Sequence, residues 1–412
     1  MAAEQNNGRL KIGIPTFLAH VYFFFNSVFL PAGLLYTQLI GPVLYLKLLL
    51  RRKRTYLFAF ILFLSFYDCI HLLTGVDYKS FAVSNILFVC TYCSVMVFYH
   101  FIKTYRKLPE LFYKILLTNA FFTVLALITY FTSYRDLLWY KNKFTHSVDS
   151  MYRLALLTYE ASYYSLLLVP LVFYFLLKLF HSQIPKGKLT ITALVLTPMI
   201  MSLSIGVISA MLMAFCIYYL LHWEKILTRK SFFWPISIAV TFTIFSVLLL
   251  ILFFPENPLF TRISNIFNGI DTSTNGRTSD SFKMAWMIAE RKSLLFGAGL
   301  GQIKIVGAEI QRIYFWYWGN LDVVRIPNTT AETLAIFGFT GILFRFSLIA
   351  YLFFKTKVWN NHFRFLMFCF IFIYQFTGSF IINIVEYTAW IFAFVNCFPE
   401  LDVAVKRKEI LV

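Results

Sequence analysis

Charged residues are scarce in this sequence, and acidic ones are rarer than basic ones. Only 14% of the 412 residues are charged, with 37 Lys and Arg against 19 Asp and Glu, while 59% are hydrophobic and 20% are aromatic. A soluble domain carries roughly 25% charged residues, so this chain lacks the polar side chains that would cover a water-soluble globule. We therefore expect its apolar surface to be buried in a lipid bilayer.

The usual sequence signals of metal and hydrolytic sites are also missing. Neither GxSxG nor HExxH occurs, and none of the seven histidines lies within 255–330 or at metal-ligand spacing. Zinc chemistry is therefore not expected, and we expect no metal and no cofactor. Cys90 and Cys93 form a CxxC without a second pair, so we interpret them as small apolar residues of a helix. The opening MAAEQNNGRLK lacks an apolar core, so no cleavable signal peptide is expected.

Long apolar runs dominate the sequence instead. Twelve of them approach or reach the about 17–25 residues of a transmembrane helix, and 14–49 and 189–221 are each interpreted as a tight hairpin. The runs are 14–29, 31–49, 55–74, 82–102, 112–132, 160–180, 189–204, 205–221, 232–254, 331–354, 365–383 and 385–397. They predict an all-α polytopic membrane protein with about 12 transmembrane helices.

Lys and Arg are distributed unevenly between the two sets of connections. One set, which includes RRKR at 51–54 and KRK at 406–408, holds 22 of the 37, and the opposite set holds 13. Because positively charged loops remain in the cytoplasm, the first set is assigned to the cytoplasm, and both termini with it. The same bias explains the net charge of +18 without nucleic acid as a partner.

Two external connections are longer than the rest. Residues 133–159 form a medium loop and residues 255–330 a long one, and long loops in compact proteins are usually functional. The chain thus divides into nine predicted transmembrane helices over 1–254, the long loop, and three further helices with a cytoplasmic tail over 331–412.

The long loop is expected to be helical in part. SFKMAWMIAERK at 281–292 predicts an amphipathic helix, with Ser279 or Asp280 as its cap. The face that this helix would bury comprises Phe282, Ala285, Trp286 and Ala289. FGAGLGQ at 296–302 predicts a glycine turn that allows another segment of backbone to approach closely.

Arginine is abundant in both external loops. The arginines in question are Arg262, Arg277, Arg291, Arg312 and Arg325 of the long loop and Arg135 and Arg153 of the medium loop. A guanidinium group presents a planar fork of donors that matches phosphate oxygens, so these residues fit a diphosphate-bearing lipid. The alternative is that individual arginines form salt bridges with loop acids such as Asp271, Asp280 and Glu290.

Glu160 is a carboxylate at the start of an apolar run. It follows Arg153 by seven residues, which is two helical turns, so a helix that began early would place both on one face. Glu160 would then either pair with Arg153, the alternative we prefer, or act as general base for a sugar hydroxyl.

Four stretches resemble the superfamily of Wzy-type O-antigen polymerases and O-antigen ligases. NGRTSDSFKMAWMIAERKSLLFGAGLGQ resembles the family's arginine, helix and glycine turn, and IPNTTAETLAIFGFTGIL resembles its closing stretch, with a GxxG-like turn at Gly338 and Gly341. MYRLALLTYEASYYSLLLVPLVF resembles the Arg…Glu-x-Ser-Tyr-Tyr span of polysaccharide polymerases. SLSIGVISAML resembles the serine–glycine break between the seventh and eighth spans.

This resemblance implies a GT-C-like glycosyltransferase at the outer face of the bacterial inner membrane, with its site facing the periplasm. The donor would be a growing glycan on undecaprenyl diphosphate, and the acceptor a single repeat unit on the same carrier. Membrane lipids, a chain-length regulator and a flippase of the same pathway are the further partners it implies. The reaction would be metal-independent if arginines stabilise the leaving diphosphate.

The resemblance also implies roles for particular residues. Arg277 is the first candidate ligand of the diphosphate, followed by Arg153 and Arg291. Glu160 is the candidate general base. The candidate substrate-binding residues are Arg291, Arg262, Tyr159, Asn328, Thr329 and Glu332.

The sequence departs from the family pattern at two places. Pro327 and Asn328 stand where ligases carry His-Asn, which favours a polymerase over a ligase. Ser-Ile-Gly at 204–206 replaces Ser-Arg-Gly and so removes an expected pyrophosphate-binding arginine, for which Arg153 is the candidate replacement.

Other function classes stay open beside the polymerase. A ligase would use the same chemistry with a lipid A–core acceptor. A flippase or transporter of lipid-linked oligosaccharide would more often show repeats, broken helices and deep charges, and Asp68, Lys114 and Arg345 are the notable charges within the runs. A purely structural membrane protein would leave the external arginines unexplained.

Overall fold

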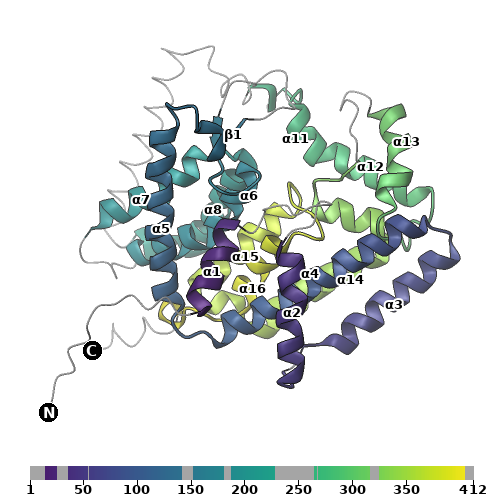
Figure 1. Cartoon of the computed structure of the whole chain (residues 1–412), viewed down its shortest axis with the longest axis horizontal. Helices are drawn as coiled ribbons and strands as arrows, with labels where there is room; N and C mark the ends of the chain where they lie inside the picture. The colour runs from purple at the N-terminus through teal and green to yellow at the C-terminus, as the bar shows by residue number, and fades with distance from the viewer. Residues whose placement is uncertain are drawn as a thin grey trace.

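The protein is mostly helical (Figure 1). The computed structural model describes residues 14–25, 36–53, 55–141, 152–180, 187–227, 264–266, 268–315 and 324–403. The helices are α1 (Ile14–Phe25), α2 (Tyr36–Leu50), α3 (Leu57–Leu73), α4 (Tyr78–Thr104), α5 (Leu108–Thr129), α6 (Ala161–Phe180), α7 (Lys188–Met201), α8 (Ile205–Leu227), α11 (Thr272–Arg277), α12 (Ser279–Glu290), α13 (Ile303–Tyr314), α14 (Thr329–Thr356), α15 (His362–Tyr374) and α16 (Ile384–Phe394). Short 3-10 turns are η2 (Arg135–Leu137), η4 (Val358–Asn360) and η5 (Pro399–Leu401), and the strands are β1 (Trp139–Lys141) and β2 (Tyr152–Leu154).

Within the described residues, four helices are long and apolar enough to cross a membrane, namely α4, α5, α6 and α14. Seven further apolar helices are shorter. Together these helices overlap eleven of the twelve predicted apolar runs; the run at 232–254 lies outside the described residues. The prediction of a helical, membrane-type architecture is therefore confirmed.

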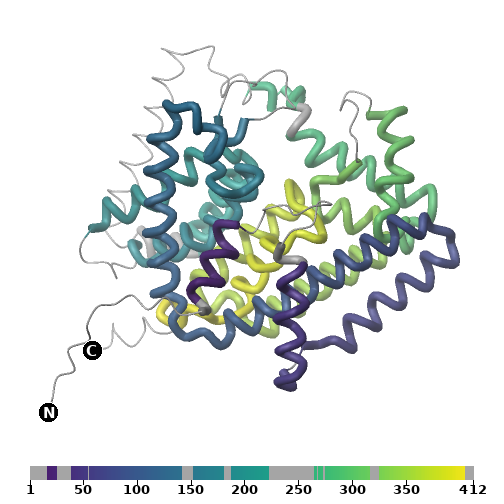
Figure 2. Tube along the Cα trace, viewed as in Figure 1, coloured from purple at the N-terminus to yellow at the C-terminus, as the bar shows by residue number. Residues whose placement is uncertain are grey.

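α15 and α16 lie between two groups of helices (Figure 1). On one side are α5 to α8, where α6 is the most enclosed helix and buries nearly its whole length, including Tyr164 and Phe173. On the other side α3, α4 and α14 pack beneath α12 and α13, around Tyr67, Met284 and Phe337. The trace in Figure 2 can be followed from α3 back along α4. These two helices are in contact, because the ring of Phe60 in α3 stacks on that of Tyr92 in α4 with the ring centroids 3.8 Å apart.

The loop predicted at 133–159 contains a small antiparallel hairpin rather than an early start of α6. β1 and β2 pair with Tyr140 opposite Arg153, and residues 142–151 between them lie outside the described part. The indole N–H of Trp139 donates to the carbonyl of Ala126 at 2.8 Å, which ties the hairpin to the end of α5. Since α6 begins only at Ala161, the expectation that Arg153 and Glu160 share one helical face is wrong.

The serine–glycine segment breaks the chain between α7 and α8, as expected. α7 ends at Met201 and α8 begins at Ile205. Leu203 between them adopts a left-handed backbone with φ 46°. Two helices therefore cover 189–221, as predicted, while their packing as a tight hairpin stays a prediction. The turn of the hairpin predicted at 14–49 includes residues 26–35, which are not described.

α12 confirms the predicted loop helix and part of its predicted face, since Ala285 and Ala289 are fully buried. The helix follows Thr278, whose side chain makes no capping hydrogen bond, so neither Ser279 nor Asp280 is the cap. Its buried side chains include Met284 and Ile288, whereas Trp286 is 44% exposed. The buried face differs from the predicted one because α12 packs on both α13 and α14. The sequence pattern of a single helix does not show where two neighbouring helices will lie.

The glycine turn of the long loop packs against a break inside α14. At Gly338 the backbone turns to φ 64° and ψ −161°. The N–H groups of Ala298 and Gly299 donate to the carbonyls of Ala335 and Ile336, and the N–H of Phe339 donates back to Leu294. These bonds satisfy backbone groups that the break would otherwise leave unpaired in an apolar environment, and the predicted close backbone approach is confirmed.

Candidate functional site

Arg277 is held at the end of the short helix α11. The carboxylate of Asp271 begins this helix by accepting the N–H of Thr274 at 2.6 Å. Ser281 of α12 donates its hydroxyl to the carbonyl of Gly276 at 2.5 Å, which fixes the turn that follows Arg277. The Arg277 side chain remains 37% exposed, so it is open to a ligand from outside.

Glu160 lies at the N-terminus of α6 and faces Arg277. Glu160 Oε1 is 3.8 Å from Arg277 Nη2, and the Glu160 side chain is 27% exposed. The same oxygen accepts the hydroxyl of Ser162, one residue into α6. The backbone carbonyl of Glu160 accepts the N–H groups of Tyr163 and Tyr164, which anchors it to the first helical turn. The structure therefore joins two predicted site residues that lie far apart in the sequence.

Two tyrosines outside the membrane helices lie close to this ion pair. Burial raises the pKa of the Tyr140 phenol, the Glu160 carboxylate raises it further, and Arg153 and Arg277 oppose that rise. Desolvation and Glu160 likewise raise the pKa of Tyr159, against Arg325 and Arg277. The positive charges of Arg153, Arg277 and Arg325 therefore reach the two tyrosines that flank the single carboxylate of Glu160, so positive charge predominates at the site.

Arg153 reaches the site from β2. Its Nε donates to the carbonyl of Ser202 at 3.1 Å, in the break between α7 and α8. Sequence reasoning placed Arg153 as a substitute for the arginine that this break lacks, and the structure does bring Arg153 to the break. The preferred partner of Glu160 was Arg153, however, and the ion pair seen across the site is made by Arg277.

Arg291 is not part of this arrangement. It follows α12, whereas Arg277 precedes it, and a helix of 12 residues separates them by about 18 Å. Arg291 pairs instead with Glu309 of α13, which is the salt-bridge alternative considered for the loop arginines. Arg262 lies outside the described residues.

Asn328, Thr329 and Glu332 line the re-entry point, but their side chains serve the protein itself. Asn328 is fully buried, and its Oδ1 caps α14 by accepting the N–H of Ala331 at 2.9 Å. Thr329 Oγ1 donates to Glu386 Oε2 at 2.5 Å. Glu332 Oε2 accepts the N–H of Ile381 at 2.6 Å. The expectation that they contact substrate therefore finds no support in their geometry, since each already has a protein partner.

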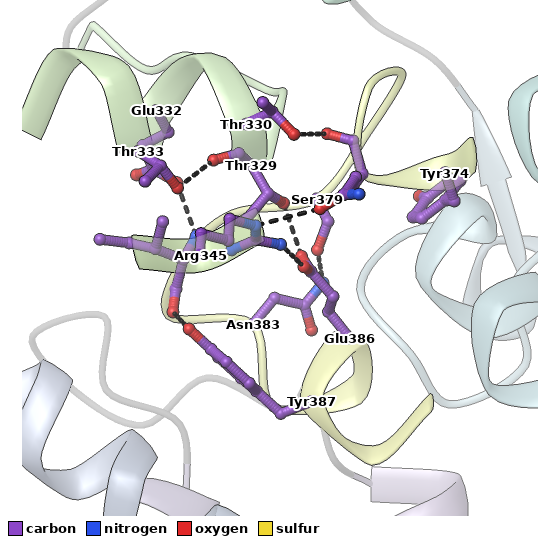
Figure 3. Close-up of polar contacts among 12 residues, drawn as sticks. Thr329, Thr330, Glu332, Thr333, Arg345, Tyr374, Ser379, Asn383, Glu386 and Tyr387 are labelled. Atoms are coloured by element: carbon purple, nitrogen blue, oxygen red, sulfur yellow. Dashed lines mark hydrogen bonds and ion pairs between the residues drawn. The ribbon is translucent and has the colours of Figure 1, made fainter. Parts of the chain in front are cut away.

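A buried polar cluster below the re-entry point was not foreseen (Figure 3). Arg345 Nη2 of α14 is 2.6 Å from Glu386 Oε1 of α16, and the side chain of Glu386 is fully buried. Arg345 Nε also donates to Gln375 Oε1 at 3.0 Å, just past the end of α15. The cluster therefore links three helices through one guanidinium group.

A sequence signal for this cluster did exist. Glu386 lies at the second position of the apolar run 385–397, and a carboxylate inside a predicted span is a functional candidate by default. Arg345 was noted as a charge within a run, but its pairing with Glu386 could not be read without the helix packing.

The arrangement suits binding of an anion close to a base. Arg277, Arg153 and Arg325 supply positive charge, and Glu160 supplies an ionisable oxygen that a neighbouring hydroxyl can reach. No family model matches the chain, and no curated protein matches it.

Proposed function

We propose that the protein is a polysaccharide polymerase of the O-antigen type, as its resemblance to the Wzy-type superfamily implies. It would be a GT-C-like enzyme of the bacterial inner membrane with about 12 transmembrane helices, both termini in the cytoplasm and its site towards the periplasm. The observation that carries the proposal is the Arg277–Glu160 pair, partly exposed at the start of the apolar helix α6, with Arg153 and Arg325 acting on the tyrosines beside it.

In the proposed reaction both substrates are glycans on undecaprenyl diphosphate. A hydroxyl of the acceptor sugar forms a bond to the anomeric carbon of the donor while the bond from that carbon to the diphosphate oxygen breaks. The electron pair leaves with the diphosphate, and the hydroxyl proton passes to Glu160. Glu160 thus acts as the general base.

Arginine supplies the electrostatic part of this mechanism. The charge that develops on the leaving diphosphate is stabilised by guanidinium donors fixed before the reaction begins. In the structure Arg277 is 3.8 Å from Glu160, a loose ion pair, so an incoming diphosphate can recruit Arg277 and leave the carboxylate to the acceptor hydroxyl. With Arg277 binding the diphosphate and Glu160 accepting the proton, the proposed reaction needs no metal ion.

Substitution of Arg277 tests the proposal directly. Arg277→Ala should lower polymer synthesis about 10²- to 10³-fold, as expected for loss of a transition-state donor, with the variant still folded and inserted. The measurement is polymer length and amount in a deletion strain that carries the variant. Arg312→Ala is the control, because Arg312 lies exposed in the last turn of α13 and is not one of the arginines assigned to the site. Full polymer from the Arg277 variant would refute the assignment.

The deletion strain itself separates the alternatives. Single repeat units attached to the final acceptor, without long polymer, support a polymerase. Finished polymer that accumulates on the carrier lipid would instead identify a ligase. Repeat units retained on the cytoplasmic side would identify a flippase.

A transporter of lipid-linked oligosaccharide is the second candidate function. Two observations favour it: the buried Arg345–Glu386 pair within apolar helices and the break in α14 at Gly338. Charged residues and broken helices at membrane depth are typical of transporters. Purified protein in vesicles decides between the two, because a transporter moves carrier-linked units across the bilayer and a polymerase lengthens them.

A further inference from the structure

Asn328 joins three separate segments directly behind Arg277. Its Nδ2 donates to the backbone carbonyl of Arg277 at 2.8 Å and to that of Phe376 at 2.6 Å. Its Oδ1 accepts the N–H of Ala331, in the first turn of α14. One fully buried amide therefore binds the long loop, the segment after α15 and the start of α14 to each other.

The segments that Asn328 joins are themselves fixed from below (Figure 3). Thr329 donates its N–H to Gly378 and its hydroxyl to Glu386. Thr330 donates both its N–H and its hydroxyl to the carbonyl of Gln375 at 3.2 Å. Glu386 also pairs with Arg345 of α14, so one carboxylate holds both the start of α14 and the part of α14 that follows its break at Gly338.

The hydrogen bond from Asn328 attaches the long loop, at Arg277, to these contacts. α11 has only six residues and α12 begins two residues after Arg277. The bond from Asn328 to the Arg277 carbonyl connects this short helix directly to the membrane helices. The Arg277 side chain then faces Glu160 from a backbone that is held in place.

We propose that Asn328 is the positioning residue for Arg277: it holds the Arg277 backbone so that the guanidinium group meets Glu160. The effect on reaction rate rests on the proposed function, whereas the effect on geometry does not. Asn328 was expected to contact substrate, and its role here is to act through Arg277 instead.

Chemical modification of Arg277 tests the geometry without reference to activity. In membrane vesicles, phenylglyoxal modifies accessible arginines, and the extent is measured peptide by peptide with mass spectrometry. Asn328→Ala should raise the modification rate of Arg277 about two- to fivefold, the gain expected from loss of a partly exposed ion pair. The rate at Arg312 should not change.

Asn361→Ala is the matched control. Asn361 is also fully buried, caps α15 by accepting the N–H of Arg364 and donates to the carbonyl of Phe398 at 2.8 Å. It lies at the opposite end of α15 from Phe376, about 20 Å away. A variant that loses an equivalent cap there should leave the modification rate of Arg277 unchanged, and an equal rise in both variants would overturn the proposal.

Asn328→Asp is a second variant that distinguishes loss of the hydrogen bond to Arg277 from a failure of the protein to fold. Aspartate keeps the oxygen that caps α14 but, when ionised, cannot donate to the carbonyls of Arg277 and Phe376. It should raise the modification rate of Arg277 at pH 8, and acidification should reduce that excess as the carboxyl group regains a proton to donate. An unchanged rate in both Asn328 variants would show that Asn328 does not position Arg277.

Activity then separates this proposal from the proposed function. Asn328→Ala should lower polymer synthesis about 10- to 100-fold, the cost of misplacing a reacting group, and should add no further loss to Arg277→Ala. Faster modification of Arg277 with undiminished polymer would uphold the positioning role and refute the catalytic one. Additive losses would mean that Asn328 acts independently of Arg277 and would overturn the proposal.

Discussion

At the scale of single residues, the surroundings of Glu160 act on neighbouring side chains. Tyr140 and Tyr159 both have raised pKa values, with burial as the largest cause and the Glu160 carboxylate as the next. Their phenols therefore stay protonated at a pH where exposed tyrosines ionise. They remain hydrogen-bond donors beside the carboxylate throughout the physiological range.

The raised pKa of Tyr140 predicts a loss of stability at high pH. An unfolded tyrosine ionises near its ordinary pKa of 10.0, while the folded one holds its proton, so the folded state binds more protons above that pH. The stability gained from the neutral phenol is complete below pH 10 and declines as pH rises beyond it.

Thermal unfolding at pH 9 and pH 11 measures this effect. Tyr140→Phe, which cannot ionise, should lose less stability between the two pH values than the wild type does. Tyr134→Phe is the control, because Tyr134 is 66% exposed. An identical pH response in wild type and Tyr140→Phe would contradict the expected coupling between Tyr140 and its charged neighbours.

At the scale of elements, the Arg345–Glu386 pair makes α14, α15 and α16 interdependent. Glu386 is fully buried, Arg345 is 14% exposed, and Gln375 completes the contact. In an apolar environment such a pair adds little net stability, but removal of one partner leaves a buried charge uncompensated. The main effect of the pair is therefore to determine which helices pack together, and its contribution to the free energy of unfolding is small.

Removal of one charge should destabilise the protein strongly. Glu386→Gln is expected to lower the free energy of unfolding by about 3–5 kcal/mol, measured by thermal unfolding in detergent. The double variant Arg345→Met with Glu386→Gln should regain part of that loss, because no charge is left unpaired. Glu110→Gln is the control and should have no measurable effect, since its pair with Lys107 is largely exposed. A double variant less stable than Glu386→Gln would argue against this account.

The elements differ in how far the sequence could predict them. Apolar runs predicted helices well, because membrane-type helices need continuous hydrophobicity and little else. The hairpin of β1 and β2 was missed because strands of three residues are too short to show alternation. Its position depends on tertiary contacts such as that of Trp139 with Ala126.

The site was predictable in part for a related reason. Glu160 stands out as a carboxylate at the edge of an apolar run, and Arg277 was selected as an arginine of the long loop through the resemblance, so both could be chosen from the sequence. Their pairing could not, since it depends on how α11 lies over α6. Asn328 was selected for its place in the chain, but its capping bond to Ala331 and its bonds to Arg277 and Phe376 could not be predicted, because an asparagine that caps a helix and one that binds a ligand look the same in the sequence.

At the scale of the whole molecule, Gly338 is where the external loop and the membrane helices join. A Cβ atom at this position would lie 2.4 Å from the backbone of Leu295, and its φ of 64° disfavours any side chain. A Cβ at Gly297 would likewise meet the backbone of Ile336 at 2.4 Å. The two parts of the protein are thus in direct backbone contact.

Gly338→Ala should separate these two parts. The backbone conformation alone costs about 1–3 kcal/mol for a residue with a side chain, and the contact with Leu295 adds to that. We expect a lower midpoint of thermal unfolding together with reduced polymer synthesis. Gly206→Ala is the matched control, because Gly206 is helical and a Cβ there meets nothing within 4 Å. Equal stability of the two variants would contradict the importance of this junction.

The backbone pairing around Gly338 also has a consequence for biosynthesis. Residues 294–299 leave the ribosome before 335–340, to which they are hydrogen-bonded in the finished protein. In the proposed topology the long loop would cross the membrane before α14 inserts, and until then its backbone groups at 294–299 would lack these partners. A chimera that exchanges the loop with that of another protein would have to exchange the first half of α14 with it, so the two are expected to be inherited as one unit.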